Sequence, residues 1–533
     1  MEEFSVDDPT QLLQAASDFA YYSGFQNDAS TKEFLDRFPL PVIINALQTK
    51  SDMPGLESTL AVCLERLFKT KYGASLIPHY MPFIQVGLKA DSPIVRCLAC
   101  KTVTCLLENF NGNNVSAAQL IVDYGVYPLL LDCLVNGNEQ VATASMDAIK
   151  RLAGLPQGMG IIVPTNTKDP THLRELATRC SSLGRVRILA LIVKLFSVSS
   201  SVASVVHKSN LLGCFEEEVN KTDDTLVMLS VLELLYELSE IQHGREFLSV
   251  STLLQLLSSI ISTSMESVLR SRAMMISGRL LYKENYMFAD ERSIRTVISA
   301  IDGSLGSSAT QDTDEYESAL EALGQIGSSI QGAELLLSSS PPAVRHVVDT
   351  AFNRQGRGKQ LAALHALGNI SGETRSENSM ILNSNSEETL RQLIYETASK
   401  TSKLTPSGLI LSVLQQDSET RLAGYRVITG LVARPWFLME VCAKKDIIDI
   451  VTDANTETTK IGLFSYPYKF SGMEARYNCC KAIQKALMSS SKVASDPSLA
   501  GIVAKVYDAV RMGPYLARKQ LEARPAVMTA DRF

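Results

Sequence analysis

The sequence predicts an all-α protein built as a right-handed solenoid, a superhelix of roughly ten to eleven stacked helical repeats. Three observations indicate this fold: a segment with the pattern of a helix pair, the return of its second helix at a regular spacing, and a glycine motif after several copies of that helix. The composition, 45% hydrophobic and 20% charged over 533 residues, supplies enough apolar side chains for a large core.

The helix pair lies within residues 125–153. Gly125 and Pro128 suit a turn that leads into a first helix, because proline is tolerated in a first helical turn. An Asn-Gly-Asn stretch around Gly137 then ends this helix. The second helix follows, with apolar or small residues at helical spacing: Val141, Ser145, Ala148, Ile149 and Leu152.

The second helix returns about every 40 to 46 residues, a period typical of armadillo and HEAT arrays. The first apolar residues of five copies mark this period: Val95, Val141, Val186, Leu226 and Val268. Five further copies are predicted at 56–67, 317–326, 360–370, 420–431 and 475–487. Ten copies of one helix therefore predict an armadillo/HEAT-like solenoid.

A glycine followed by apolar residues comes directly after several of these helices. The motif lies at Gly73, Gly244 and Gly332. The ends of two copies also match closely, 322–326 and 366–370. Polar, turn-rich stretches without periodicity are predicted to be loops or, for the last, an irregular repeat: 303–314, 339–342 and 371–386.

The two ends of the chain carry opposite charge. Residues 1–40 hold eight acidic and two basic residues, which accounts for the whole net charge of −6. We expect acidic cap helices over 1–50, the repeat array over 51–511 with a last helix at 500–511, and a basic tail over 512–533. A net negative chain is not expected to bind nucleic acid non-specifically.

The sequence predicts neither a membrane span nor export. No apolar run approaches the roughly 20 residues that a spanning helix needs. The start, MEEFSVDDPT, is acidic where a secretory signal peptide is basic and then apolar. We therefore expect a monomer when free, located in the cytosol with the nucleus as a second compartment, and ten reduced cysteines.

The motifs of catalytic, metal and cofactor sites are incomplete, so we expect no enzyme, no metal and no cofactor. Gly358 and Lys359 lack the rest of a P-loop, and Gly158 with Gly160 lacks the third glycine of a dinucleotide site. Cys97 and Cys100 have zinc-ligand spacing, but no second pair follows, so both are predicted to be core residues. The six histidines are scattered.

Instead, an array of helix pairs offers a long concave surface lined by the second helix of each repeat. Aligning the copies predicts polar, inward-facing positions that bind a protein partner. These positions are Arg66, Lys101, Asp147, Arg151, Tyr236, Glu321, Gln325, His365, Asn369, Arg426, Lys481 and Lys485. Their charge changes from basic through mixed and acidic to basic, which favours an extended protein partner over a uniformly charged polymer.

Three short blocks resemble one known family. They are Gln242-His243-Gly244-Arg245-Glu246-Phe247-Leu248, the block from Leu422 through Arg434-Pro435-Trp436, and Gly513-Pro514-Tyr515. The sequences of these blocks, and their order along the chain, are similar to those of the 26S proteasome non-ATPase regulatory subunit 5 family. Trp436 lies in the second block, as a core anchor between repeats or as a contact residue.

This resemblance implies a dedicated chaperone for assembly of the base of the proteasome regulatory particle. Such proteins bind the C-terminal domain of one ATPase subunit, in a precursor with a second ATPase subunit and a large non-ATPase scaffold subunit. They leave before the mature particle forms. The resemblance brings no catalytic residue and no contact motif.

Other functions remain open from the sequence alone. A general armadillo-repeat scaffold or adaptor with another client has the same fold. Nuclear-import armadillo proteins use a ladder of tryptophan and asparagine, whereas this chain offers only Trp436 and Asn369. A ubiquitin-ligase subunit would need a RING or U-box module, which residues 1–50 do not supply.

Overall fold

The computed structural model is helical throughout the part that it describes, and no strand occurs there. The described residues are 9–49, 53–109, 116–164, 169, 171–221, 224–241, 243–244, 252–282, 290–306, 312–376, 380–457, 472–489 and 499–514. They fall into two compact units, Met1–Leu248 and Ser249–Phe533.

In each unit one series of helices packs side by side, each helix against the next; we call each series a ladder. In unit 1 the ladder consists of α1 (Pro9–Tyr21), α4 (Leu56–Phe68), α7 (Pro93–Asn109), α10 (Glu139–Ala153), α13 (Ser182–Phe196) and α16 (Thr225–Glu240). In unit 2 it consists of α19 (Ser267–Leu280), α21 (Thr313–Ile326), α24 (Arg357–Ser371), α27 (Ser418–Leu431), α30 (Gly472–Ser489) and α32 (Ala500–Met512).

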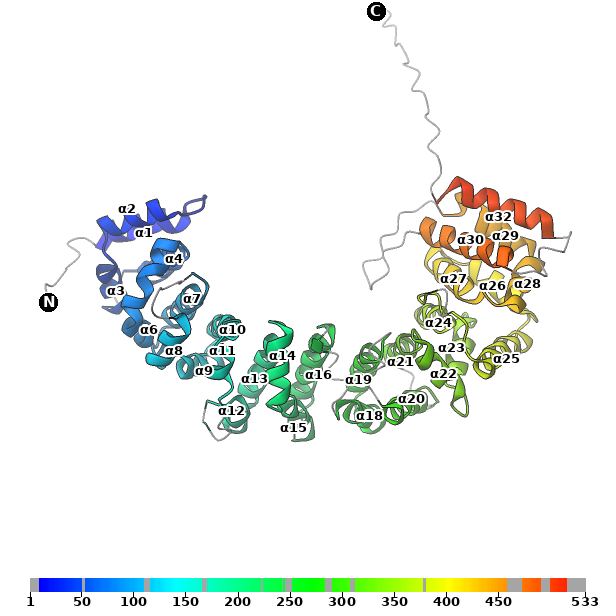
Figure 1. Ribbon diagram of the computed structural model, residues 1–533, viewed down its shortest axis with the longest axis horizontal. Helices are drawn as coiled ribbons and strands as arrows, with labels where there is room; N and C mark the ends of the chain where they lie inside the picture. Colours follow the sequence, from blue (N-terminus) through cyan, green and yellow to red (C-terminus); the bar gives the residue numbers. More distant parts are fainter. Residues whose placement is uncertain are drawn as a thin grey trace, which may run out of the picture. The chain divides into compact units, whose positions relative to one another are not determined.

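The remaining helices connect the ladder helices and form the second layer of each unit (Figure 1). In unit 1 they are α2 (Asp28–Arg37), α3 (Leu40–Gln48), α5 (Lys71–Leu76), a 3-10 turn (Ile77–Tyr80), α6 (Met81–Leu88), α8 (Ala117–Asp123), α9 (Val126–Asn136), α11 (Gly158–Ile162), α12 (Leu173–Arg179), α14 (Ser200–Lys208) and α15 (Gly213–Lys221). In unit 2 they are α18 (Leu253–Thr263), α20 (Glu291–Gly306), α22 (Ile330–Ser338), α23 (Val344–Ala351), α25 (Ser384–Lys400), α26 (Pro406–Leu414), α28 (Pro435–Ala443), α29 (Lys445–Thr452) and a 3-10 turn (Ala454–Thr456).

This arrangement confirms the predicted all-α solenoid, because all ten predicted copies of the second helix are ladder helices. The alignment of the copies was wrong in one respect. Leu226 and Val268 are exposed, and the next residues, Val227 and Leu269, are buried instead. The first apolar residue of a copy therefore does not always face the core. The handedness and the number of repeats stay predictions.

Two predicted loops are shorter than expected. Helix α20 continues to Gly306 and α21 begins at Thr313, so much of 303–314 is helical. Helix α25 begins at Ser384, inside the stretch 371–386. Stretch 339–342 is non-helical, as predicted. The predicted basic tail lies outside the described residues apart from 512–514, as do residues 1–8 of the predicted cap.

Two arginines, half-buried Arg375 and buried Arg434, fix the segment between α24 and α25. Arg375 donates to the carbonyl oxygens of Gly327 (2.6 Å) and Ile370 (2.8 Å), at the ends of two ladder helices. Arg434 donates to the carbonyl of Ser371 (3.0 Å) and to both carboxylate oxygens of Glu387. Burial, and then the charge of Arg434, lower the pKa of Arg375 to about 10.

Capping side chains fix where the ladder helices begin. Each cap accepts a hydrogen bond from a backbone N–H two or three residues further along the chain, and such a cap contributes about 1 kcal/mol. The caps are Asn138, Ser181, Asp224, Asp312 and Asp417.

Four glycines allow the chain to turn closely at the ends of ladder helices. They are Gly73, Gly158, Gly244 and Gly332. A Cβ atom at any of them would stand well under 3.0 Å from a carbonyl oxygen six residues earlier, in the ladder helix that has just ended. The glycine motif of the sequence therefore marks a backbone contact that excludes every side chain.

Glycines also bring the unit 2 ladder helices close together. A Cβ at Gly278 of α19 would lie 2.8 Å from the Cα of Ala322 in α21, and one at Gly324 would lie 2.6 Å from the Cα of Ala366 in α24. The matching sequence ends around Gly324 and Gly368 are thus points of helix–helix contact.

A recurring arginine–glutamate bridge joins neighbouring repeats. The fourth residue of three ladder helices is an arginine: Arg185, Arg270 and Arg421. Each donates through Nη1 to a carbonyl of the preceding loop and through Nε to a buried glutamate of the next repeat. These glutamates are Glu218, Glu315 and Glu457.

Within the described ranges, no single helix is long and apolar enough to cross a bilayer. Helices α8 and α9 reach that length only together, and they meet at an angle of 80°.

The glycine turn gives a stability prediction. Gly332→Ala should lower the free energy of unfolding by roughly 1–3 kcal/mol, because the new Cβ collides with the carbonyl of Ile326. Gly303 is exposed within α20, and no atom lies near the position that its Cβ would take. Gly303→Ala should therefore raise the free energy of unfolding by about 0.5–1 kcal/mol. Urea denaturation followed by circular dichroism measures both, and equal midpoints for the two variants would contradict the contact.

Candidate protein-interaction face

The ladder helices carry all of the predicted contact residues, five in unit 1 and seven in unit 2. In unit 1, Arg66 of α4 donates to the backbone carbonyl of Tyr22 (2.6 Å) and so holds the end of α1. Asp147 of α10 is exposed, and Tyr236 of α16 is half-buried. The Arg66 side chain therefore stabilises the fold, whereas the Asp147 carboxylate is accessible to a partner.

Ion pairs between neighbouring ladder helices involve two of the predicted residues. Lys101 of α7 pairs with Glu65 of α4 at 2.7 Å, and Arg151 of α10 pairs with Glu108 of α7 at 2.6 Å. A third pair, between Lys194 of α13 and Glu237 of α16 at 2.7 Å, extends the series. These acidic partners are not among the predicted contact residues, although opposite charges about one repeat apart in the sequence were a signal for them.

In unit 2, Glu321 and Gln325 lie one turn apart on α21. The Gln325 amide donates to the Glu321 carboxylate at 3.0 Å. Burial raises the pKa of Glu321, and the charge of Arg279 and the Gln325 hydrogen bond only partly oppose this effect.

The structure brings three predicted residues together between α24 and α27. Arg426 lies 2.6 Å from Nδ1 of His365 and donates to the Asn369 side chain at 3.0 Å. Glu373, which is not among the predicted contact residues, balances the guanidinium charge at 2.8 Å. Since Arg426 and Asn369 are 6% and 8% exposed, this cluster ties two ladder helices together beneath the surface.

His365 is held neutral in this cluster. Burial, and then the charge of Arg426, lower its pKa from 6.5 to about 3. A neutral imidazole accepts a hydrogen bond, whereas a protonated one would face the guanidinium with a like charge. His365 therefore serves as an acceptor for Arg426.

Lys481 and Lys485 are exposed one turn apart on α30. The Lys481 ammonium lies 5.6 Å from the centre of the Tyr477 ring, within the range of a cation–π contact. The accessible residues of the predicted set are thus Asp147, with Lys101 and Arg151 in their ion pairs, on the ladder of unit 1, and Lys481 and Lys485 on the ladder of unit 2. We call the exposed positions of each unit's ladder its ladder face.

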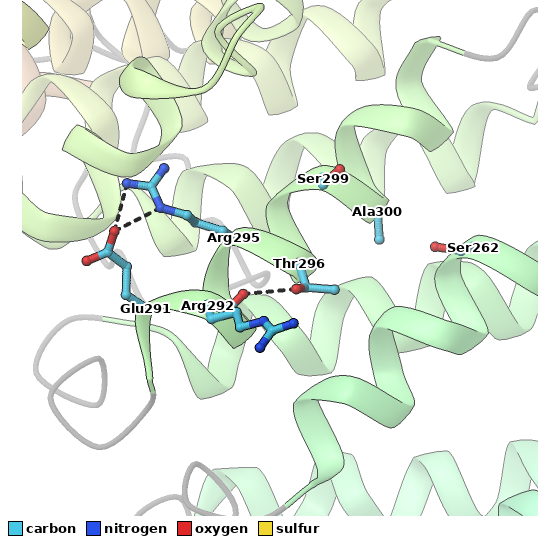
Figure 2. A pocket seen from close by; sticks show the side chains of 7 residues that line it. All are labelled: Ser262, Glu291, Arg292, Arg295, Thr296, Ser299 and Ala300. Carbon is cyan, nitrogen blue, oxygen red and sulfur yellow. Dashed lines mark hydrogen bonds and ion pairs between the residues drawn. The ribbon is translucent and has the colours of Figure 1, made fainter.

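A shallow depression of about 680 Å³ lies between α18 and α20, in the second layer (Figure 2). Its lining includes Arg292, Arg295 and Ser262, and Arg295 is paired with Glu291 at 2.7 Å. These groups are exposed, so the depression does not enclose a ligand. No group of three or more metal-ligating side chains occurs within the ranges the structure covers.

The fold places the protein in the class of α-helical repeat arrays that bind other proteins. Arrays in which each repeat contacts its neighbours build extended surfaces for protein partners, and here the open positions are polar and of both signs. The chain belongs to the family described as “Proteasome non-ATPase 26S subunit”, which matches residues 56–527.

Named relatives agree with this family. The chain is 20% identical to the human “26S proteasome non-ATPase regulatory subunit 5” over 485 residues, which cover 89% of this chain and 87% of the relative. It is 19% identical to the bovine protein of the same name, with 80% of each chain covered. Among solved structures, an engineered protein superposes with a TM-score of 0.41 at 15% identity, covering 80% of this chain and 96% of its own.

The His365 cluster gives a pH prediction. Below pH 6.5 the unfolded chain protonates His365 and the folded protein does not until about pH 3. The stability contributed by neutral His365 is thus complete above pH 6.5 and is lost as the pH falls, by up to about 1.4 kcal/mol per pH unit.

His365→Gln keeps an acceptor for Arg426 without a titrating ring, so unfolding midpoints in urea at pH 7 and pH 5 should differ less for this variant than for the parent protein. The exposed His79→Gln is the matched control and should retain the parent's pH dependence. An unchanged pH dependence in His365→Gln would show that His365 does not titrate in this way.

Proposed function

We propose that this protein is a chaperone for assembly of the base of the 26S proteasome regulatory particle. It binds the C-terminal domain of an ATPase subunit through the ladder face and dissociates before the mature particle forms. The precursor also contains a second ATPase subunit and a large non-ATPase scaffold subunit. The observation that carries the proposal is the family match over residues 56–527.

Further support comes from the relatives and from the face itself. The relatives are named regulatory and non-ATPase subunits, and the match to the human protein extends over most of both chains. This favours a protein that acts by binding and not by catalysis. The ladder of unit 1 exposes Asp147 and that of unit 2 exposes Lys481 and Lys485, so the two ladders do not share one sign of charge, which suits a folded protein domain better than a polyanion.

The mechanism is steric. A ladder face that covers the small domain of an ATPase subunit keeps the proteolytic core particle away from the same subunit. Binding of the chaperone and of the core particle is then mutually exclusive, and release of the chaperone permits the final assembly step. Each encounter takes place in the cytosol, with a monomeric chaperone.

The first test identifies the client. We expect the tagged protein, purified from its own cells, to bring down base ATPase subunits in near-stoichiometric amounts without core-particle subunits, as measured by mass spectrometry. Stoichiometric core-particle subunits would contradict mutual exclusion. A different dominant partner would favour the second candidate, a general armadillo-repeat adaptor.

The second test locates the surface. Asp147→Lys combined with Lys481→Glu reverses one exposed charge on the ladder of each unit and should reduce recovery of the ATPase subunits at least about fivefold. Lys89→Glu reverses an equally exposed charge beside the second-layer helix α6 and should leave recovery unchanged. Circular dichroism checks that all variants fold, and equal recovery from both would place the contact elsewhere.

A further inference from the structure

Two cysteines from different layers meet inside unit 1. Cys100 lies on the ladder helix α7 and Cys133 on the second-layer helix α9, and both side chains are fully buried. The Cys100 thiol hydrogen-bonds to the Cys133 sulfur. Cys133 also donates to the backbone carbonyl of Leu88, at the end of α6, at 3.4 Å. The two sulfur atoms are therefore held against each other by their surroundings; we call them the thiol pair.

An arginine serves the Cys133 side of the thiol pair. Nη2 of Arg96, on α7, donates to the Cys133 sulfur at 3.5 Å and to the Asp132 carboxylate at 3.0 Å. The Asp132 side chain is 55% exposed, so water weakens its attraction for the guanidinium. Nε of Arg96 is buried and has no hydrogen-bond partner among the described residues. The guanidinium therefore has both charge and a donor left for an anionic sulfur.

This setting divides the thiol pair into two roles. The hydrogen bond from Cys100 lowers the pKa of Cys133; burial opposes this effect, and the hydrogen bond and charge of Arg96 reinforce it. The hydrogen bond to Cys133, and then burial, raise the pKa of Cys100. Since the thiolate is the nucleophilic form of cysteine, Cys133 is the reactive sulfur, and Cys100 remains a thiol beside it.

Other buried cysteines lack this setting. Burial raises the pKa of Cys63, on α4 of the same unit, to about 12, and that of Cys442, on α28, to about 11. No nearby cation offsets the effect of burial at either residue. Both are therefore inert thiols and serve as internal references for the thiol pair.

We propose that Cys133 and Cys100 form a redox modification site that reacts with hydrogen peroxide and closes to a reversible disulfide between α7 and α9. Arg96 is the gate. Its Nη2 reaches from the surface carboxylate of Asp132 to the Cys133 sulfur, and its side chain is 19% exposed. When this side chain swings outward, a molecule close to water in size reaches the sulfur. The site consists of buried thiols, so the proposal does not rest on the function proposed above.

The reaction has two steps. The Cys133 thiolate attacks one peroxide oxygen, the O–O bond breaks and hydroxide leaves, so that Cys133 becomes a sulfenic acid. The Cys100 sulfur then displaces the sulfenic hydroxyl group, which leaves with the Cys100 proton as water. The two cysteines are oxidised by two electrons, and the peroxide is reduced by the same two. A thiol reductant reverses the reaction by exchange.

Peptide mapping tests the site in the parent protein. The reduced full-length protein is treated with hydrogen peroxide, its remaining thiols are alkylated in denaturant, and a tryptic digest is analysed by mass spectrometry. We expect a Cys100–Cys133 link that disappears with reductant, while Cys63 stays alkylated. Cys97 and Cys105 share the tryptic peptides of the thiol pair, so Cys97→Ala and Cys105→Ala are the matched controls and should still form the link.

Three variants test the roles of the named residues. Arg96→Gln keeps a donor but removes the charge, so it should slow formation of the link at least about fivefold, because the thiolate fraction of Cys133 falls. Arg295→Gln removes an arginine from another surface ion pair and should react like the parent. Cys100→Ala should leave Cys133 as a sulfenic acid, which dimedone traps. Circular dichroism checks that each variant folds.

Four outcomes would overturn the proposal. They are the absence of the link at peroxide concentrations that leave Cys63 reduced, oxidation of Cys63 as fast as that of Cys133, an unchanged rate in Arg96→Gln, and a parent protein in which dimedone traps Cys133 as fully as in Cys100→Ala. The last result would mean that the Cys100 sulfur does not reach Cys133 during the reaction.

Discussion

The close approach of consecutive ladder helices is the constraint on which the rest of the structure depends. Each repeat contacts only its neighbours, so the stability of an array resides in these interfaces. Where Gly278 meets Ala322 and Gly324 meets Ala366, there is room for a backbone and a methyl group but no more. The large apolar side chains of these helices must therefore point into the space between the layers. Polar groups lie on the open face, at the helix ends, or, where they are buried between ladder helices as Arg426 and Asn369 are, in hydrogen-bonded clusters.

That confinement accounts for the arginines. A helix that ends inside an array leaves carbonyl groups without water, and Arg375 and Arg434 supply donors to them. A buried carboxylate in turn needs a cation, because an unpaired charge in the interior is costly. Glu218, Glu315 and Glu457 are buried, and each pairs with a half-buried arginine of the preceding repeat: Arg185, Arg270 and Arg421. Charge neutrality thus links each of these repeats to its successor.

The sequence predicted the ladder helices because apolar spacing and period are properties of the chain itself. It misplaced Leu226 and Val268, since an alternation of apolar and polar residues does not show which of two adjacent apolar residues faces inward. The helix α25 was missed because its first turn is rich in serine and asparagine, which also favour loops. Arg426 and Asn369 were correctly placed on ladder helices, but their burial depends on Glu373, whose position follows from the tertiary structure alone.

The ion pairs between neighbouring ladder helices in unit 1 affect how a partner arrives. Glu65 with Lys101, Glu108 with Arg151, and Lys194 with Glu237 are opposite charges at about contact distance, and at a longer range their fields largely cancel. In the binding proposed above, these paired charges therefore add little long-range attraction, and their share of the association rate changes little with ionic strength. Selectivity for a partner then arises after contact, because complexes with other proteins dissociate faster than the complex with the correct partner.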